Sequence, residues 1–357
     1  MSDRASSAER YSYSALLDFA TALGEKLDMP PAMARVQAEI FVEADLMGHT
    51  THGLNLLPNA LKEIQSGQLQ TAGEPTVVSD KHAAVLWDGN RLPGTWLVVS
   101  ALEEAMRRMS ETPVIAWVIR RSGHVGALSP YLLRASRAGY VVTMMTTNPN
   151  MRTVVPAGGK DPLIAPNPIG FGYPTQREPI LIDISTAAVA NGWIRRWASE
   201  KRSLPEKWLQ DSEGNLTDDP AALFGSPPGA LLPLGGPLLA HKGFALGLMV
   251  ETLTGGLSGV GHTGIPADAG NLVYLQLVDP AAFVGHDLFV QDTSALAEQC
   301  RISRPRPGFD SVRMPGDMAL ALRHKQMSEG IDLYPSIMPD LVKWASKLGV
   351  APPQPIV

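Results

Sequence analysis

The stretch from residue 122 to residue 192 constrains the fold more than any other part of the sequence. It contains two short runs rich in Val and Ile, residues 140–145 and 180–184, and residues that break regular structure bound both runs. Such runs are typical of buried strands. Polar residues follow each run, at positions 146–148 and 185–186. Because open α/β sheets bind ligands outside the carboxyl ends of their strands, we expect an α/β fold with a ligand site where these two runs end.

The segment between the two runs is longer than an ordinary connection and shows no clear period. It is rich in Gly and Pro, yet apolar residues recur along it, which indicates that it packs against the core. We therefore expect a packed loop without regular structure. The apolar residues are Val154, Val155, Leu163, Ile164, Ile169 and Phe171.

A histidine lies at the start of this stretch, within the sequence Ser-Gly-His-Val-Gly. His124 falls between a strand-like run, residues 114–119, and a helix-like run, residues 131–138. The flanking glycines leave room for a ligand to approach the backbone, and histidine exchanges protons near neutral pH. A catalytic role and a purely structural hydrogen bond within the turn are both open at this point.

A second histidine cluster, His-Thr-Thr-His-Gly at residues 49–53, follows a predicted helix over residues 31–47. His49 and His52 are three residues apart, a spacing that can place two side chains on one helical face for a metal ion. The sequence offers no Cys pair and no His-Glu-x-x-His helix to complete such a site. We therefore expect no metal, and a capping or catalytic histidine where the helix ends before Gly53.

Two basic segments are candidate anion sites. Residues 193–207 are predicted to form a helix in which aromatic residues mix with cations, and we interpret the cations as a solvated helix face rather than a phosphate site. His241, Lys242 and Gly243 are predicted to begin another helix, where free backbone N–H groups and a lysine form an anion-binding arrangement. The cations considered in the first segment include Arg195, Arg196, Lys201 and Arg202.

One literal Gly-x-Gly-x-x-Gly motif occurs, at Gly259, Gly261 and Gly264. It follows a predicted helix rather than a strand, and it leads into Ile265-Pro266. The strand-turn-helix context that gives this motif its meaning is therefore absent, and we reject it as a dinucleotide fingerprint.

The composition excludes several classes of protein. With 357 residues, the chain is long enough for one large or two ordinary domains. A net charge of −5 gives no reason to expect nucleic acid or an anionic membrane as a partner. The single cysteine, Cys300, fits a reducing compartment. The first residues are polar and no apolar run approaches the length of a membrane span, so we expect a cytoplasmic location and no membrane partner.

Eight short motifs, ordered along residues 15–330, resemble those of the type-2 malate/L-lactate dehydrogenase family. They are ADLMGHTTHG, SGHVG, TTN, VVPAGGKDPLIAPNP, LIDISTAAVANG, LPEKW, HKG and MPG. This family also includes ureidoglycolate, sulfolactate and diketogulonate enzymes and reductases of cyclic imino acids. The resemblance implies a three-layer α/β/α fold with a mixed sheet, a cofactor site unrelated to the Rossmann fingerprint, and assembly as a homodimer.

By matched position, the resemblance implies that His124 transfers the proton and that His52 is a second active-site histidine. Thr51 stands where the family usually has Ser. The resemblance also implies that the cofactor is NAD or NADP. The positions that match cofactor contacts are Asn148, Asp183, Ile184, Ser185, Lys242, Gly243, Pro315 and Gly316.

Two positions depart from the family pattern. The family commonly has Arg four residues after the histidine that matches His52, where bidentate pairing would suit a substrate carboxylate; this position is Leu56. We therefore expect Asn55, Leu56 and Asn167 to contact a 2-oxo or 2-hydroxy acid other than malate. The residue after the glycine of the VANG motif is commonly Lys, or Asp in some imine reductases, and it is Trp193 here.

We expect three parts: a helical N-terminal region over residues 11–75, a mixed-sheet core for cofactor and substrate over residues 76–325, and a C-terminal helix over residues 326–357 that packs back on the N-terminal region. The favoured function is hydride transfer between NAD(P) and C2 of a small 2-hydroxy or 2-oxo acid. Three alternatives stay open. They are reduction of a cyclic imino acid such as pyrroline-2-carboxylate or piperideine-2-carboxylate, a catalytically silent cofactor-binding protein, and a metal hydrolase that uses the three histidines named above.

Overall fold

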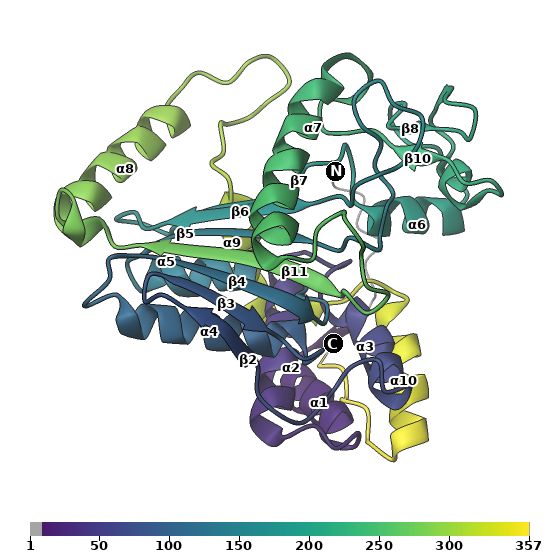
Figure 1. The fold of residues 1–357 in the computed structure, drawn as a ribbon, viewed down its shortest axis with the longest axis horizontal. Helices are drawn as coiled ribbons and strands as arrows, with labels where there is room; N and C mark the ends of the chain where they lie inside the picture. Colours follow the sequence, from purple (N-terminus) through teal and green to yellow (C-terminus); the bar gives the residue numbers. More distant parts are fainter. Residues whose placement is uncertain (1–8, 357) are drawn as a thin grey trace.

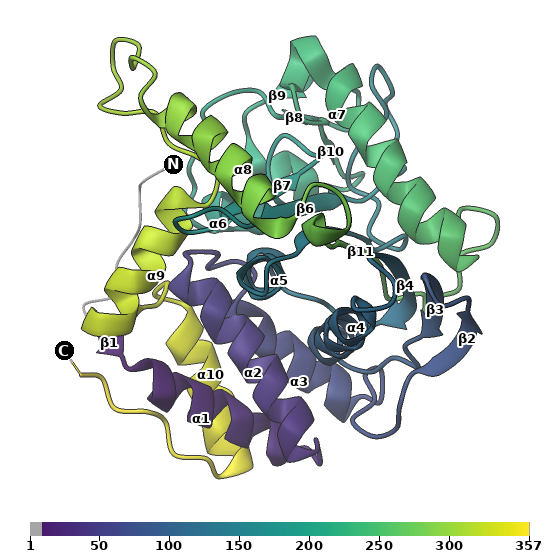
Figure 2. The same cartoon turned by 90° about the vertical axis from the view of Figure 1, so that its left-hand side faces the viewer.

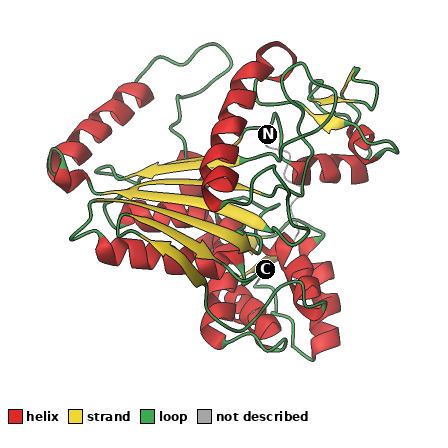
Figure 3. Ribbon diagram, viewed as in Figure 1, coloured by secondary structure: helices red, strands yellow, loops and turns green. Residues whose placement is uncertain are grey.

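The structure, a computed structural model, describes residues 9–356. A seven-stranded sheet with the strand order β2-β3-β4-β11-β5-β6-β7 forms its centre (Figures 1 and 3). β3 and β4 pair in parallel and the other neighbours pair antiparallel, so the sheet is mixed, as the fold class predicted. The strands are β2 (Thr76–Asp80), β3 (Ala84–Asp88), β4 (Val114–Ser122), β5 (Val141–Thr147), β6 (Pro168–Tyr173), β7 (Ile180–Ser185) and β11 (Asn271–Val278).

Four of these strands, β3, β4, β5 and β7, run in the same direction. β11 lies antiparallel between β4 and β5, and β6 lies antiparallel between β5 and β7. The carboxyl ends of the four strands therefore share one edge of the sheet. The two runs predicted as strands are β5 and β7, and the polar residues that follow them lie along this edge, as expected.

The segment between β5 and β7 contains a strand that the sequence did not predict. β6 has a proline at its start and two glycines inside it, which weakens the strand pattern. A Cβ on Gly170 would lie 3.1 Å from Leu128, and one on Gly172 would lie 2.7 Å from the Ser136 hydroxyl. The glycines are there because α5 (Ser129–Arg137), a helix earlier in the chain, packs closely on β6. The prediction of a loop without regular structure was wrong for this part. Val154, Val155 and Ile164 are buried as expected, whereas Leu163 is 47% exposed.

Helices cover both faces of the sheet (Figures 1 and 2). α4 (Gly94–Arg108) and α5 (Ser129–Arg137) contact one face, and α7 (Gly236–Glu251) with the π-helical turn Thr252–Gly256 contacts the other. This arrangement confirms the three-layer α/β/α architecture.

The first and last described parts of the chain share a second hydrophobic core, beside α4 and α5 (Figure 2). β1 (Arg10–Tyr11) pairs antiparallel with β12 (Ile331–Asp332). Leu16 of α1, Phe41 of α2, Leu61 of α3 and Leu341 of α10 are all buried in this core. The helices are α1 (Tyr13–Glu25), α2 (Pro31–Leu46), the 3-10 turn Leu54–Leu56, α3 (Leu57–Gln65) and α10 (Ile337–Leu348).

The remaining elements lie outside the layers described above: residues 191–231 are near the carboxyl edge of the sheet, whereas His286 lies beside Gly139, at the opposite edge. They are α6 (Asn191–Ser199), β8 (Leu209–Gln210), β9 (Leu216–Thr217), the 3-10 turn Pro220–Phe224, β10 (Ala230–Leu231), the 3-10 turn Pro280–Ala282, α8 (His286–Arg301) and α9 (Asp317–Glu329). Gly259, Gly261 and Gly264 lie in the loop between the π-helical turn and β11, so a helix precedes them and a strand follows them. No helix between residues 9 and 356 is long and apolar enough to cross a membrane.

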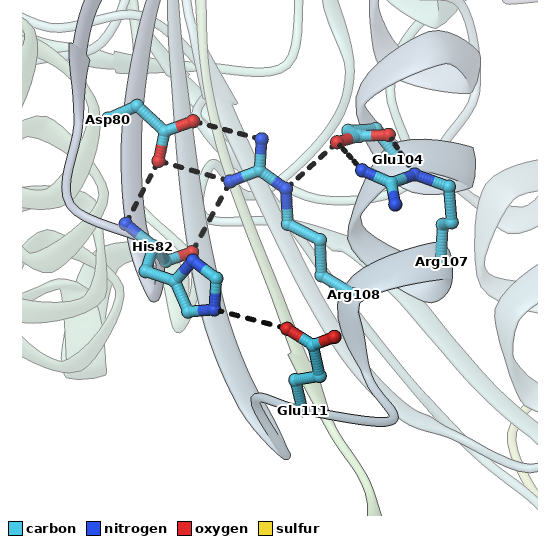
Figure 4. A network of polar contacts seen from close by, with 6 residues as sticks. All are labelled: Asp80, His82, Glu104, Arg107, Arg108 and Glu111. Carbon is cyan, nitrogen blue, oxygen red and sulfur yellow. Dashed lines mark hydrogen bonds and ion pairs between the residues drawn. The ribbon is translucent and has the colours of Figure 1, made fainter.

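A network of charges fastens the outer hairpin of the sheet to α4 (Figure 4). The guanidinium of Arg108 donates to both carboxylate oxygens of Asp80, at 3.0 and 2.9 Å, and to Glu104 at 2.9 Å. Arg107 donates to the same Glu104 at 2.7 and 2.6 Å, whereas Glu111 lies 3.7 Å from His82. The hydrogen bonds from Arg107 and Arg108 lower the pKa of Glu104 to about 2.

Candidate active site

Two histidines that are far apart in the sequence lie side by side at the carboxyl edge of the sheet. His124 follows β4, and His52 lies in the turn after α2. The centroids of their rings are 5.9 Å apart, with an angle of 43° between the ring planes. One small substrate group can therefore contact both rings.

The ring of His124 has one fixed hydrogen bond. Its Nδ1 accepts from the backbone N–H of Gly126 at 2.9 Å, so the neutral ring carries its proton on Nε2. His124 lines a recess together with Phe41, Leu56 and Pro93. The side chain is open to solvent on one side, yet the surrounding protein desolvates it and, with His52 nearby, lowers its pKa to about 3.

The ring of His52 has a different partner. Its Nδ1 lies 2.8 Å from the hydroxyl of Thr51, which can either donate or accept a hydrogen bond. Burial lowers the pKa of His52; Asp183 opposes this effect, and His49 and Arg196 add to it.

Asp45, near the end of α2, stabilises the turn that carries His52. The carboxylate of Asp45 accepts a hydrogen bond from the backbone N–H of Leu54 at 2.7 Å, and a Cβ on Gly53 would lie 2.4 Å from the same carboxylate. α2 ends at Leu46, and Gly48, with φ of 85°, follows the end of the helix. Gly48, and not Gly53, is therefore the glycine that follows the C-terminus of α2, which corrects the prediction that the helix ends before Gly53.

His49 points its Nε2 into the protein, where the atom is buried and has no hydrogen-bond partner. Among residues 9–356, no three His, Cys, Asp or Glu side chains are placed to hold a metal ion.

Asp183, on β7, joins the sheet to the start of α5. One oxygen of its carboxylate accepts from the backbone N–H of Leu128 at 3.0 Å, and from the backbone N–H and hydroxyl of Ser129 at 2.9 and 3.0 Å. An anion at a helix N-terminus is favourable because free N–H groups and the helix dipole point toward it. The same carboxylate acts on His52 and raises its pKa.

Three more of the predicted cofactor residues lie at the ends of β5 and β7. Ile184 is an apolar side chain with 44% of its surface exposed, beside Asp183 on the outermost strand. The hydroxyl of Ser185 donates to the carbonyl of Pro166 at 2.9 Å. Asn148 donates to the side-chain oxygen of Asn271 at 3.3 Å.

Lys242 and Gly243 lie on α7, which begins earlier than predicted. The helix starts at Gly236 and leaves helical geometry at Leu239, so these two residues belong to the first turn after a kink. Gly243 allows a close approach, because a Cβ there would lie 2.3 Å from the backbone of Leu234. Lys242 is exposed and makes no ion pair with any residue in the described part of the chain.

Pro315 and Gly316 lie against the start of β7. The carbonyl of Pro315 accepts from the backbone N–H of Leu181 at 3.2 Å. Gly316 has φ of 91°, and a Cβ there would lie 3.0 Å from the same N–H. A long-range contact thus brings a late segment of the chain to the start of the strand that carries Asp183 and Ile184.

The predicted substrate residues occupy different places. Leu56 lines the recess with His124, and Asn55 is exposed nearby in the chain. Asn167 is only 1% exposed, and its amide donates to Glu251 at 2.8 Å. Asn167 therefore lies beneath the carboxyl edge, in contact with α7, and not on the wall of the recess.

One functional candidate was missed by the sequence analysis. Arg195 is exposed, as the interpretation of a solvated helix face requires, but Arg196 is 8% exposed and donates two hydrogen bonds to Thr50. The interpretation was wrong for Arg196. Charge alone does not show which arginine faces inward, because the segment that meets α6 comes from far away in the sequence.

This fold is shared by a class of dehydrogenases that act on hydroxy acids. The sequence profile of the malate/L-lactate dehydrogenase family matches residues 11–342, and the chain belongs to this family. The family inferred from the short motifs is thereby confirmed.

Individual relatives cover nearly the whole chain. L-Lactate dehydrogenase of Cupriavidus necator is 33% identical over 333 residues, which are 91% of this chain and 94% of that protein. The structure of malate dehydrogenase from Pyrococcus horikoshii OT3 has a TM-score of 0.87 at 25% identity and covers 96% of both chains. Δ1-Piperideine-2-carboxylate reductase from Pseudomonas syringae has a TM-score of 0.81 at 30% identity, over 95% of this chain and 100% of that one.

Proposed function

We propose that this protein transfers a hydride between NAD or NADP and C2 of a small 2-hydroxy or 2-oxo acid. The observation that carries the proposal is the pair of histidine rings, 5.9 Å apart, at the carboxyl edge of a dehydrogenase fold. His124 offers a fixed N–H donor at Nε2. His52 has the Thr51 hydroxyl as a partner, which permits the ring to gain and lose a proton. These are the two requirements for interconverting a carbonyl and a hydroxyl group.

The residues around the edge fit a nicotinamide dinucleotide. Ile184 presents an exposed apolar side chain for a flat ring, and Lys242 is an exposed ammonium without an ion pair among the described residues, which suits a phosphate. We propose that Asn148, Asp183 and Ser185 line the same site, with Gly243, Pro315 and Gly316 shaping its walls. When bound, the cofactor supplies or removes the hydride.

The two rings divide the proton chemistry. Nδ1 of His124 accepts from the backbone N–H of Gly126, so Nε2 carries the ring proton and can donate a hydrogen bond to the substrate oxygen. A further proton would have to bind at Nδ1, and this would break the hydrogen bond from Gly126. In His52, a proton on Nδ1 can point to the Thr51 hydroxyl while Nε2 takes or releases another proton. We therefore propose that His52 moves the proton and His124 holds the oxygen, which differs from the roles implied by the resemblance.

The recess indicates the kind of substrate. The position at which the family commonly has a carboxylate-binding Arg is Leu56, an apolar side chain in the wall next to His124. We propose that the substituent on C2 is apolar or uncharged and that malate is a poor substrate. Backbone N–H groups or the exposed Asn55 would then anchor the single carboxylate.

A second candidate, reduction of a cyclic imino acid, is favoured by one observation. The chain is 30% identical to a Δ1-piperideine-2-carboxylate reductase and shares its fold. Trp193, where some imine reductases have Asp, counts against it. A protein that binds the cofactor without turnover is a third candidate, and the presence of both histidines counts against it.

We also propose that the protein is a cytoplasmic homodimer. α7 and the residues after it leave a row of apolar side chains open to solvent, which is unusual for a monomer. The largest exposed fractions in this row are those of Leu238 at 88%, Leu257 at 54% and Leu248 at 46%.

Absorbance at the reduced-nicotinamide band tests the proposal. The purified protein is mixed with NADH or NADPH and with pyruvate, oxaloacetate, phenylpyruvate, a branched-chain 2-oxo acid or pyrroline-2-carboxylate. Oxidation with an apolar 2-oxo acid supports the proposal and identifies the cofactor. Oxidation with pyrroline-2-carboxylate alone would favour the second candidate, and binding of a cofactor without any turnover would favour the third.

A further inference from the structure

Arg196 binds the turn that carries His52. Its Nη1 donates to the hydroxyl of Thr50 at 2.7 Å, and its Nη2 donates to the carbonyl oxygen of Thr50 at 2.7 Å. Two donors of one rigid guanidinium thus bind the side chain and the backbone of a single residue. This pairing fixes the orientation of Thr50, two residues before His52.

The guanidinium is held in place by aromatic rings. Its central carbon lies 3.7 Å from the ring centroid of Tyr334 and 5.3 Å from that of Trp193. Tyr334 lies between β12 and α10, and its hydroxyl donates to Glu200, just after α6. Arg196 therefore joins three segments that are distant in the sequence.

The same face of α6 meets the next residue of the turn. Gly192 precedes Arg196 by one helical turn, and a Cβ on Gly192 would lie 2.9 Å from Cβ of Thr51. The hydroxyl of Thr51 in turn lies 2.8 Å from Nδ1 of His52. α6 thus supports Thr50 and Thr51, the two residues that lead into His52.

Burying this cation has a cost that the contacts do not fully offset. Arg196 is 8% exposed, and no carboxylate in the described part of the chain forms an ion pair with it. Desolvation lowers the pKa of Arg196, and the electrostatic effects of Tyr334, Asp45 and Glu200 raise it. An apolar side chain of similar size could fill the space without the cost of burying a charge. Stability alone therefore gives little reason for an arginine at this position.

We propose that Arg196 is a positioning residue: it holds the turn at residues 49–53 in the arrangement that aims His52 at His124. The inference rests on the proposed function for its effect on catalysis. The effect of Arg196 on the position and the pKa of His52 can be measured without any reaction.

Several titratable groups face His52, and Arg196 is one of them. They are Asp183 on β7, His49 in the same turn, His124 after β4 and Arg196 on α6. Asp183 raises the pKa of His52, and Arg196 and His49 lower it. Removing the charge of Arg196 should therefore raise the pKa of His52.

Three variants separate geometry from charge. Arg196→Met removes both the charge and the two hydrogen bonds to Thr50. Arg196→Lys keeps the charge but cannot form the bidentate hydrogen bonds. Arg195→Met is the matched control on the exposed side of α6. We expect kcat to fall about 10²-fold in Arg196→Met and in Arg196→Lys, since small misplacements of a reacting group have effects of this size. The KM for the cofactor should stay within about twofold, because Arg196 contacts Thr50, Trp193 and Tyr334, none of which is a proposed cofactor residue.

The titration of His52, followed by NMR of its ring proton in the protein without substrate, is the second readout. We expect its pKa to rise in Arg196→Met and to stay near the wild-type value in Arg196→Lys and Arg195→Met. Thr50→Val, which removes one of the two acceptors and leaves Arg196 in place, provides a milder variant should Arg196→Met fold poorly, and it should lower kcat by about tenfold.

Unchanged kcat in folded Arg196→Met, or a loss of thermal stability without any change in kcat or in the His52 titration, would overturn the proposal. If the wild-type protein oxidises neither NADH nor NADPH with any of the acids, the proposed function fails. The His52 titration still decides whether Arg196 acts on that ring.

Discussion

The backbone N–H of Gly126 donates a hydrogen bond to Nδ1 of His124 at 2.9 Å. Gly126 has φ of 76°, and a Cβ there would lie 3.2 Å from the carbonyl oxygen of His52. A side chain at this position would be strained by the backbone and crowded by the neighbouring turn. The second glycine of Ser-Gly-His-Val-Gly therefore does two things: it sets the tautomer of His124, and it lets the two histidine segments approach each other.

The first prediction separates the roles of the two histidines. In both His52→Gln and His124→Gln, the amide N–H can replace a donor at Nε2, but it cannot transfer a proton. Because His52 is the proposed proton carrier, its variant should lose about 10²–10⁴ in kcat, at least tenfold more than the His124 variant. Steady-state kinetics measure this difference. An equal loss in the two variants would contradict the assignment, and a larger loss in His124→Gln would show that the roles are reversed.

The pH profile of the wild-type protein gives an independent check on the same ring. The pKa of His52 is below its ordinary value of 6.5, and removal of the hydroxyl proton requires the neutral ring. Oxidation of the hydroxy acid should therefore stay level above pH 6.5 and fall at lower pH. This falling limb should persist in His124→Gln and disappear in His52→Gln.

The second prediction concerns substrate choice. Leu56→Arg places a guanidinium in the wall of the recess that His124 lines. A bidentate pair with a second carboxylate should raise kcat/KM for oxaloacetate and malate relative to apolar acids by about tenfold or more. Leu56→Met is the control, with similar volume and no charge, and it should leave the ratio within about twofold. If both variants have the same ratio, Leu56 does not determine specificity.

The sequence predicted the sheet and the family because each has a local signature, and a similar signature marked the two histidines as candidates. β5 and β7 are short apolar runs with polar ends, and His124 sits in a glycine-flanked turn. β6 lacks such a signature, since Gly170 and Gly172 are set by packing against α5 rather than by strand propensity.

Arg196 lacked a local signature for a related reason. Arg195 and Arg196 are adjacent and chemically identical, and their environments differ only because Thr50 and Tyr334 meet α6 on one side. The start of α7 was likewise missed, because Pro237 allows a helix to begin before the kink at Leu239. Contacts between distant segments are the information that residue patterns leave out.

The third prediction concerns the charge network between α4 and the β2–β3 hairpin. Glu104 accepts from Arg107 and Arg108, and its pKa of about 2 is below its ordinary value of 4.5. Its contribution to the free energy of unfolding is therefore present above pH 4.5 and lost as the pH falls toward 2. Glu104→Gln should destabilise the protein by about 1–2 kcal/mol at pH 7 after allowance for solvent screening.

Denaturant unfolding of Glu104→Gln and of a matched control, Glu111→Gln, measures this effect. Glu111 belongs to the same network but is largely exposed, and within residues 9–356 its side chain pairs only with His82, at 3.7 Å (Figure 4). Its removal should change the free energy of unfolding by less than about 0.5 kcal/mol. The gap between the two variants should narrow as the pH falls from 4.5 toward 2, and a gap that does not depend on pH would show that the charge of Glu104 is not its source.

The fourth prediction tests the apolar row on α7 as a contact between two copies of the chain. Leu238 is 88% exposed, and a carboxylate in its place would be desolvated and unpaired in an apolar interface. We expect the wild-type protein to sediment as a dimer and Leu238→Asp to sediment as a monomer. Val78→Asp, on the edge strand β2 and 45% exposed in the wild type, should remain a dimer. Analytical ultracentrifugation of all three proteins at one concentration decides the matter, and a Leu238→Asp variant that stays dimeric would place the interface elsewhere.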